Sequence, residues 1–203
     1  MIPARSPQER SAPGPGSCNG FLYTVGLGAN LGDRVATLEK AIGAITDRLA
    51  TGALRQSSWW LSSAEGGEGP AYVNAVLRFT SQHTPQALLG ALLDIEAVLG
   101  RVRTHRNAPR TVDLDILLAQ DLRIWPDRRD ILLAPHLRIS SGDLVIPHPR
   151  MHRRAFVLLP LLELDPSAEI PGIGPAARAL CALPEHDCRR ADSGAYPCGT
   201  IGS

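Results

Sequence analysis

Two aspartates placed two positions apart, just after an arginine-rich segment, are the residues of this chain best suited to chemistry. Residues 101–110 hold four arginines and no acid, and Asp113 and Asp115 then interrupt a run of Val, Leu and Ile. Because side chains alternate along a strand, both carboxylates would face one side, with Cβ atoms roughly 6–7 Å apart. Such a pair can hold one or two Mg²⁺ ions, and neighbouring arginines can bind phosphate oxygens. The pattern predicts a site for cation-bound polyphosphate.

Each half of this pattern also has an ordinary explanation. A lone Asp-x-Asp is most often a solvated strand edge, and an arginine cluster is most often a solvated face or a nucleic-acid contact. Here the two are adjacent, and carboxylates inside an otherwise apolar strand are costly unless they face a cation or a cleft. The combination favours the phosphate site.

A second basic segment follows further along the chain, where His148 precedes Pro-Arg-Met-His-Arg-Arg. Taken alone, His148 could equally be a loop residue without a role in binding. Placed after the sheet, His148 and Arg154 could complete a phosphate pocket, because both side chains can donate hydrogen bonds to phosphate oxygens. Arg150 and Arg153 are expected to be solvated.

Aromatic residues make up only 4% of the chain, so those near the proposed site are informative. Packing is the default role of Phe156. Two aromatic faces such as Tyr72 and Phe156 can instead enclose a flat heterocycle, and a nearby amide such as Asn74 can read its donors and acceptors.

A glycine-rich segment, Gly26 to Gly32, is similar to a dinucleotide-binding loop. The similarity fails because Leu31 occupies the place of the third glycine. The segment also lacks the Lys-Ser/Thr pair of a phosphate-binding P-loop. We expect these glycines to turn a strand into a helix, at a turn that could still line a site.

Hydrophobic periodicity predicts the element order β-α-β-β-α-β. The expected strands are 21–28, 53–60, 73–80 and 111–119, and the expected helices are 33–49 and 85–99. This order predicts an α+β fold, a ferredoxin-like βαββαβ antiparallel sheet with both helices on one face. Additional C-terminal elements are expected as a hairpin or loop insertion in 123–141, an edge strand at 144–147, and helices at 154–164 and 175–183. Pro160 should kink or end the first of these helices.

Length and composition predict one folded domain in a chain of 203 residues. We expect a disordered tail at 1–19, the domain at 20–183 and a flexible tail at 184–203. A net charge of +1 gives no general attraction to nucleic acid or anionic membranes. The four cysteines form no C-x-x-C pair, and no apolar run reaches membrane-spanning length. A soluble cytoplasmic protein is expected.

From about Tyr23 to Pro166 the chain resembles the 6-hydroxymethyl-7,8-dihydropterin pyrophosphokinase family. Its strongest matches are the segments GRVRTHRNAPRTVDLDILL and IPHPRMHRRAFVLLPL. The resemblance implies an ATP-dependent diphosphokinase of folate biosynthesis, which transfers diphosphate to the hydroxymethyl group of the dihydropterin and releases AMP. It implies two Mg²⁺ ions, with ATP as co-substrate. We expect a monomer whose partners are these small molecules, without nucleic acid or membrane.

The resemblance also implies a role for each matching residue. Asp113 and Asp115 match the Mg²⁺ ligands and, with Arg103 and Arg110, form the expected catalytic set. The expected nucleotide-side residues are Arg101, Glu96, His148 and Arg154. The expected pterin-side residues are Ser62, Tyr72, Asn74 and Phe156. The chain departs from the family at 62–65, where a Thr and a proline-containing loop are usual, and at Asn107-Ala108, which replaces a common Trp-Gly pair.

Two rival functions fit parts of the sequence. A single-strand RNA-binding module can have the same element order, but it needs aromatics on its central strands and a basic sheet face. Asp113 and Asp115 on the fourth strand would repel RNA phosphates. A regulatory domain that binds nucleotide without turnover is the second rival, because the pterin loop is altered.

Overall fold

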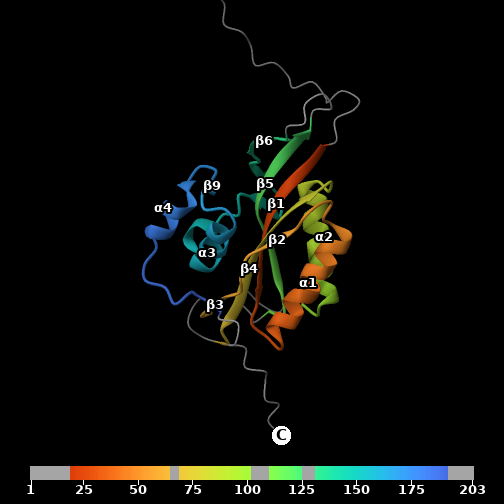
Figure 1. Ribbon diagram of the computed structural model, residues 1–203. Helices are drawn as coiled ribbons and strands as arrows, with labels where there is room; N and C mark the ends of the chain where they lie inside the picture. The colour runs from red at the N-terminus through yellow and green to blue at the C-terminus, as the bar shows by residue number, and fades with distance from the viewer. Residues whose placement is uncertain (1–18, 65–68, 102–109, 125–130, 192–203) are drawn as a thin grey trace, which may run out of the picture.

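An antiparallel sheet forms the middle layer of the fold (Figure 1). The computed structural model describes residues 19–64, 69–101, 110–124 and 131–191. Within these residues the sheet has the strand order β11-β3-β4-β1-β5-β6, and β2 also pairs with β4. Its strands are β1 (Asn19–Ala29), β2 (Arg55–Gln56), β3 (Trp60–Ser62), β4 (Tyr72–Ser81), β5 (Asp113–Ile124), β6 (Ile131–His136) and β11 (Arg189–Arg190). The two long strands β4 and β5 therefore flank β1.

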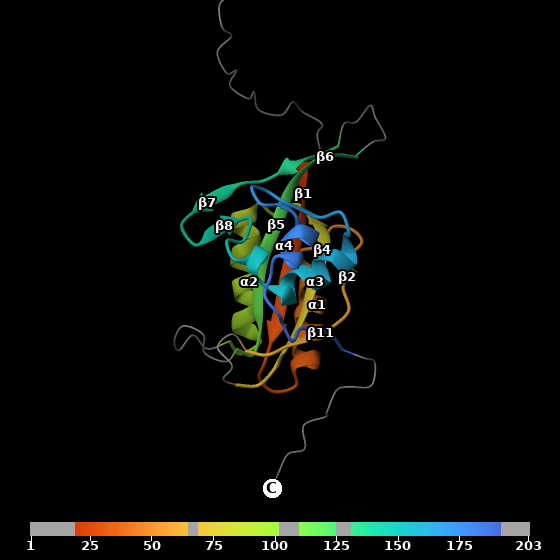
Figure 2. The ribbon, with the colours of Figure 1, turned by 90° about the vertical axis from the view of Figure 1, so that its left-hand side faces the viewer.

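Helices cover both faces of this sheet. The helices α1 (Arg34–Arg48) and α2 (Pro85–Val98) lie on one face, and α3 (Ala155–Leu164) and α4 (Ala176–Cys181) lie on the other (Figure 1). Figure 2, turned by 90°, shows α3 and α4 in front of the sheet. The remaining described elements are β7 (Ile139–Ser141), β8 (Leu144–Ile146), β9 (Glu169–Ile170), β10 (Gly174–Pro175) and a short 3₁₀ helix (Met151–Arg153).

Capping residues set where α1 and α2 begin. The Asp33 carboxylate accepts a hydrogen bond from the Ala36 nitrogen at 3.1 Å, and the Thr84 hydroxyl accepts one from the Ala87 nitrogen at 3.3 Å. Both bonds satisfy backbone N–H groups that have no partner within the first turn of a helix. Pro85 follows Thr84 at the first helical position, where a missing N–H costs nothing.

Two apolar clusters, one on each side of the sheet, hold the layers together. Leu38, Ile45, Leu88 and Leu92 from α1 and α2 are buried in one cluster with the facing side chains of β1, β4 and β5. The other cluster joins α3 to the opposite face and contains Val76, Leu117, Leu118, Leu158 and Leu161. Burying one such side chain contributes about 1.5–3 kcal/mol.

A β-bulge breaks the alternation of β5. The pairing between β1 and β5 shifts register between Thr24 and Val25, which pair with Leu118 and Ile116. Leu117 is the extra residue of the longer strand, and both Leu117 and Leu118 lie in the cluster beneath α3. Two successive side chains thus face the same layer, as a bulge permits.

The structure confirms the α+β class, with an antiparallel sheet, and differs from the prediction in detail. The second expected strand, 53–60, is divided into β2 and β3. The expected edge strand, 144–147, is β8, which pairs with β7 in a separate two-stranded sheet. Helix α3 matches the expected helix 154–164, and Pro160 lies inside it without ending it. Within the expected flexible tail, Arg189–Arg190 form β11, whereas residues 1–18 and 192–203 lie outside the described part of the chain.

None of the helices in the described parts of the chain combines the length and the apolar character that crossing a membrane requires.

Candidate functional site

Two glycines of β1 form the floor of a cavity of about 190 Å³ on the α3 side of the sheet. Gly28 pairs with Asp113 on β5 and Asn74 on β4, and Gly26 pairs with Asp115 and Val76. Residues paired across strands share a face, so β1 contributes no side chain where its neighbours contribute polar ones. The expected strand 21–28 contains Gly26 and Gly28, and both lie within β1, where they leave the space open. Gly32, with a φ of 61°, lies at the expected turn between this strand and α1.

The walls of the cavity bring together most of the residues singled out in the sequence. Its lining includes Ser62, Tyr72, Asn74, Arg110, Asp113, Asp115, His148, Arg154 and Phe156. Arg101 and Glu96 lie beside it, behind Asp113. Arg103 falls outside the described residues. Arg150, which was expected to be solvated, also lines the cavity, although it is exposed.

The prediction that Asp113 and Asp115 share a face is confirmed. Both carboxylates line the cavity, whereas Leu114 and Ile116 between and after them are buried under α1 and α2. Strict alternation over this part of β5 produces the arrangement. The bulge begins only after Ile116.

Asp113 is the centre of a chain of ion pairs. Its Oδ1 lies 2.6 Å from Nη1 of Arg110 and 3.1 Å from Nη2 of Arg101. Arg101 also pairs with Glu96, a buried residue of α2. The carboxylate that faces the cavity thus holds two guanidinium groups at its edge.

Glu96 anchors this network from inside the fold. Its Oε1 accepts a hydrogen bond from the Leu114 nitrogen at 2.7 Å, directly between the two aspartates. Its Oε2 is buried and has no hydrogen-bond partner among the described residues. Burial raises the pKa of Glu96 above its usual value, although Leu114 and Arg101 oppose this change. Glu96 therefore positions Arg101 and β5 from behind and does not touch the cavity.

Asp115 is more open, with 41% of its side chain exposed. Nε2 of His148 lies 3.8 Å from its Oδ2. Partial enclosure and the charge of Asp113 raise the pKa of Asp115 to about 6, against the opposing charges of Arg154 and Arg110. Two carboxylates that repel each other in this way are a favourable site for a divalent cation.

The donor set fits Mg²⁺ bound together with a phosphorylated substrate. No group of three or more His, Cys, Asp or Glu side chains converges within the described ranges, so a fully protein-made metal cage is absent from them. Mg²⁺ usually takes one or two carboxylates and completes its octahedron with waters and substrate phosphates. Asp113 and Asp115 could supply these two carboxylates.

The other end of the cavity is aromatic and amide-lined. The Asn74 amide nitrogen donates to Oγ of Ser62 at 3.0 Å and to the Trp60 carbonyl at 3.3 Å. These bonds leave its Oδ1 above Gly28, where an added Cβ would lie 3.3 Å away. The amide therefore presents an acceptor to the cavity floor.

Phe156 links the two ends of the cavity. The guanidinium carbon of Arg154 lies 5.3 Å from the centroid of the Phe156 ring, a cation–π distance. Both residues stand at the start of α3. Further along the rim, the backbone nitrogen of His148 donates a hydrogen bond to the Leu117 carbonyl at 2.9 Å. This bond connects the second basic segment to β5.

Asn30 belongs to the site but was not singled out from the sequence. Its Oδ1 accepts a hydrogen bond from the backbone nitrogen of Arg110. It lies just after β1, as Arg110 lies just before β5. The sequence offered one signal for Asn30, a polar residue directly after a glycine-rich strand. Its burial and its partner, 80 positions away, could not be inferred from that signal.

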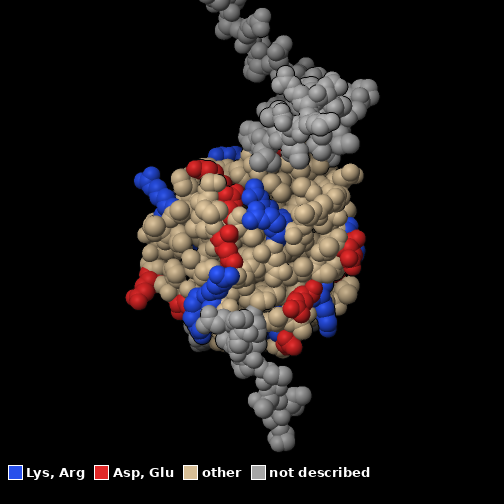
Figure 3. Space-filling model, viewed as in Figure 1, with Lys and Arg blue, Asp and Glu red and all other residues tan. Residues whose placement is uncertain are grey.

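The surface charge of the molecule is mixed in sign. On the face drawn in Figure 3, acidic and basic side chains are interspersed. This agrees with the net charge of +1.

Comparison with known proteins gives a consistent result. Residues 24–166 match the family described as 7,8-dihydro-6-hydroxymethylpterin-pyrophosphokinase (HPPK). A 2-amino-4-hydroxy-6-hydroxymethyldihydropteridine pyrophosphokinase of Synechocystis sp. is 36% identical over 152 residues, covering 75% of this chain and 69% of that protein. The Bacillus subtilis protein of the same name is 34% identical over 152 residues, with 74% and 81% covered. The chain belongs to the 7,8-dihydro-6-hydroxymethylpterin-pyrophosphokinase family.

Proposed function

We propose that this cavity is where the chain transfers diphosphate from ATP to the hydroxymethyl group of 6-hydroxymethyl-7,8-dihydropterin, giving AMP and the pterin diphosphate. The activity is that of the family, an ATP-dependent transferase of folate biosynthesis. One observation supports placing it here. A single cavity has paired carboxylates and guanidiniums at one end and an aromatic, amide-lined surface at the other.

The aromatic end suits the pterin. Tyr72 and Phe156 offer ring faces to a flat heterocycle, and Oδ1 of Asn74 can accept a hydrogen bond from its N–H groups. Ser62 holds the Asn74 amide in this orientation through the 3.0 Å bond. The pterin would lie over Gly28, where the floor is open.

The acidic end suits the triphosphate and two Mg²⁺ ions. Asp113 and Asp115 would hold the ions, which when bound supply Lewis-acid stabilisation of the phosphate charge. The pterin oxygen attacks the β-phosphorus in line and AMP leaves, so the protein contributes mainly position and charge.

The arginines and His148 provide the positive charge. Arg101 and Arg110 already lie at Asp113, within reach of phosphate oxygens that approach its carboxylate. A guanidinium makes paired hydrogen bonds to such oxygens, which suits it to the developing charge on AMP. Arg103 is assigned the same role, and His148 and Arg154 are assigned to the nucleotide.

We also propose the finer features that the sequence indicated. The order β3-β4-β1-β5, with α1 and α2 on one face, supports a ferredoxin-like core. The folded domain is taken to span 20–183, with the segment 187–191 attached at its edge. A cytoplasmic monomer acting on small molecules, without nucleic acid or membrane, completes the proposal.

Magnesium-dependent release of AMP tests the assignment. With ATP and the dihydropterin alcohol, Asp115→Ala should lower kcat by about 10²–10³ or more, the effect of losing one strong transition-state contact. Asp94→Ala, which removes an exposed carboxylate of α2, is the control and should leave kcat unchanged. AMP release by Asp115→Ala at the wild-type rate would contradict the metal role. ATP binding without AMP release in the wild type would favour a regulatory domain, and RNA binding instead of turnover would favour the RNA module.

A further inference from the structure

The C-terminal segment 187–191 lies against the outer edge of β3, beyond residue 166, where the match to the family ends. Arg189 and Arg190 pair with Leu61 and Trp60 in an antiparallel ladder. The Ala191 nitrogen then donates to the Trp59 carbonyl at 2.8 Å. Without this segment, β3 would be the exposed edge of the sheet.

Asp187 extends the contact from β3 into the wall of the cavity. Its Oδ2 accepts a hydrogen bond from the Ser63 nitrogen at 3.0 Å and a second one from the Ser63 hydroxyl. The hydrogen bond from the hydroxyl holds the pKa of Asp187 below its usual value. Ser62, Ser63 and Ala64 all line the cavity. One carboxylate from the tail thus fixes the middle of a three-residue wall segment.

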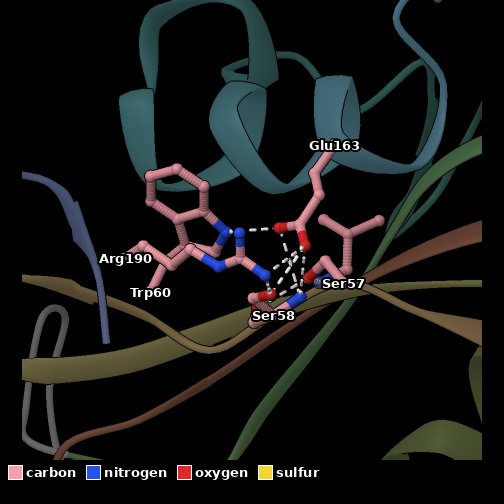
Figure 4. Close-up of polar contacts among 6 residues, drawn as sticks. Ser57, Ser58, Trp60, Glu163 and Arg190 are labelled. Atoms are coloured by element: carbon pink, nitrogen blue, oxygen red, sulfur yellow. Dashed lines mark hydrogen bonds and ion pairs between the residues drawn. The ribbon is translucent and has the colours of Figure 1, made fainter. Parts of the chain in front are cut away.

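A second set of contacts ties the same strand to α3. Oε2 of Glu163 accepts from the Trp60 indole nitrogen at 3.0 Å, and its Oε1 accepts from the Ser58 nitrogen at 3.1 Å and from the Ser58 hydroxyl at 2.6 Å (Figure 4). Arg190 lies beside this cluster, with Nη2 3.4 Å from Oε1 of Glu163, and it also donates to the Ser58 hydroxyl. Figure 4 shows the Glu163 carboxylate, from α3, and the Arg190 guanidinium, from β11, pointing toward one another.

These contacts act on the residues proposed to bind the pterin. Asn74 receives its orientation from β3, through the Trp60 carbonyl and the Ser62 hydroxyl. Strand β3 has only three residues, and such a short strand has few hydrogen bonds of its own to resist displacement. A shift of β3 would therefore move both the wall and the amide.

We infer that the segment 187–191 is a positioning element for the pterin end of the cavity, acting through Ser63 and β3. The inference rests on the proposed pterin end and extends it to a part of the chain outside the family match. None of its residues lines the cavity. Its effect should fall on pterin binding, with ATP binding and the chemical step little changed.

The test is steady-state kinetics on the full chain with Asp187→Ala. Loss of its two hydrogen bonds to Ser63 should raise the KM for the dihydropterin about 5- to 10-fold. The KM for ATP and kcat should stay near the wild-type values. Asp187→Asn keeps an acceptor oxygen and should recover part of the loss. Arg189→Ala is the matched control, because it changes an exposed side chain of β11 and leaves the backbone ladder in place.

Hydrogen exchange gives an independent readout. Amides of residues 58–64 should exchange faster in Asp187→Ala and at the wild-type rate in Arg189→Ala. An unchanged pterin KM in Asp187→Ala, or an equal rise in both KM values, would overturn the inference.

Asn74→Ala separates this inference from the proposed function. If Asn74→Ala raises the pterin KM and Asp187→Ala does not, the pterin end stands and the positioning role fails. If Asn74→Ala leaves the pterin KM unchanged while the wild type turns over, the proposed pterin end fails, and the inference fails with it.

Discussion

Asn30 and Arg110 hold each other by a reciprocal pair of hydrogen bonds. The Arg110 nitrogen donates to Oδ1 of Asn30 at 2.8 Å, and the Asn30 nitrogen donates to the Arg110 carbonyl at 3.2 Å. The pair joins the end of β1 to the start of β5. It fixes the backbone of Arg110 at the point from which its guanidinium reaches Asp113.

Asn30→Ala should therefore impair catalysis more than stability. Small displacements of a catalytic group cost up to about 10²-fold in rate, so we expect kcat to fall roughly 10- to 100-fold. The free energy of unfolding should fall by only about 1 kcal/mol. Asp33→Ala, which removes the cap of α1, is the control. Its free energy of unfolding should also fall by about 1 kcal/mol, whereas its kcat should stay at the wild-type value. Equal kcat values in the two variants would contradict the role of Asn30.

Gly28→Ala should obstruct the pterin end of the cavity. An added Cβ would lie 3.3 Å from Oδ1 of Asn74 and 3.7 Å from Cδ1 of Tyr72. The methyl group would also fill the floor on which the pterin is proposed to lie. We expect the pterin KM to rise about 10-fold, equivalent to roughly 1.4 kcal/mol, with the KM for ATP unchanged.

Gly43→Ala is the matched glycine control. Gly43 lies in α1, and no heavy atom lies within 4 Å of its added Cβ. This variant should gain about 0.5–1 kcal/mol in stability and keep both KM values. A Gly28→Ala enzyme with unaltered pterin KM would rule out the floor as the binding surface.

Phe156→Leu should affect both substrates, but unequally. Loss of ring stacking costs about 1–3 kcal/mol for a flat heterocycle, so the pterin KM should rise roughly 10-fold or more. Arg154 would also lose its cation–π contact, worth about 0.5–1 kcal/mol, so the KM for ATP should rise about 2- to 5-fold. Phe156→Tyr keeps the ring and serves as the control. The assignment fails if the leucine variant binds the pterin as tightly as the tyrosine variant.

Asp165→Asn should weaken the attachment of α3 to the sheet in a pH-dependent way. Oδ2 of Asp165 lies 2.7 Å from Nη1 of Arg78 on β4, and Ser167 donates to Oδ1 at 2.8 Å. Partial burial alone would raise the pKa of Asp165. The hydrogen bonds from Ser167 and Arg78 outweigh this and hold the pKa below its usual value.

The direction of this pKa shift fixes the sign of the pH effect. Because folding lowers the pKa, the ionised carboxylate stabilises the protein above its ordinary pKa of about 3.9, and this stability is lost as the pH falls through the folded value. At pH 7 the variant should lose about 1 kcal/mol, or roughly 2–4 °C in Tm, after allowance for solvent screening. The difference in Tm from wild type should narrow at pH 3. A difference that is the same at both pH values would show that the charge of Asp165 is not involved.

Local patterns in the sequence were sufficient to predict the long elements and the central pair of acids. Asp33, Pro85 and the periodic leucines mark α1 and α2 because the information lies within one or two helical turns. The alternation around Leu114 marks the common face of Asp113 and Asp115 for the same reason. These features depend on neighbours only a few positions apart.

The features that sequence reasoning missed depend on distant partners. The gap between β2 and β3 falls at Ser57, whose hydroxyl accepts from the Val76 nitrogen at 3.0 Å and so replaces a regular ladder contact. Contacts such as Asp187 with Ser63, 124 positions apart, have no signal in the local sequence.

The bulge at Leu117 makes one strand serve two structural purposes. Before it, β5 points acids into solvent-accessible space. After it, two consecutive leucines support the helix whose first turn carries Phe156. An engineered version of β5 with perfectly regular pleating would keep the acids but turn one of those leucines toward the opposite layer. We expect such a protein to retain the two carboxylates on the cavity face and yet lose the support of the α3 wall, because the irregularity sets the spacing between the two.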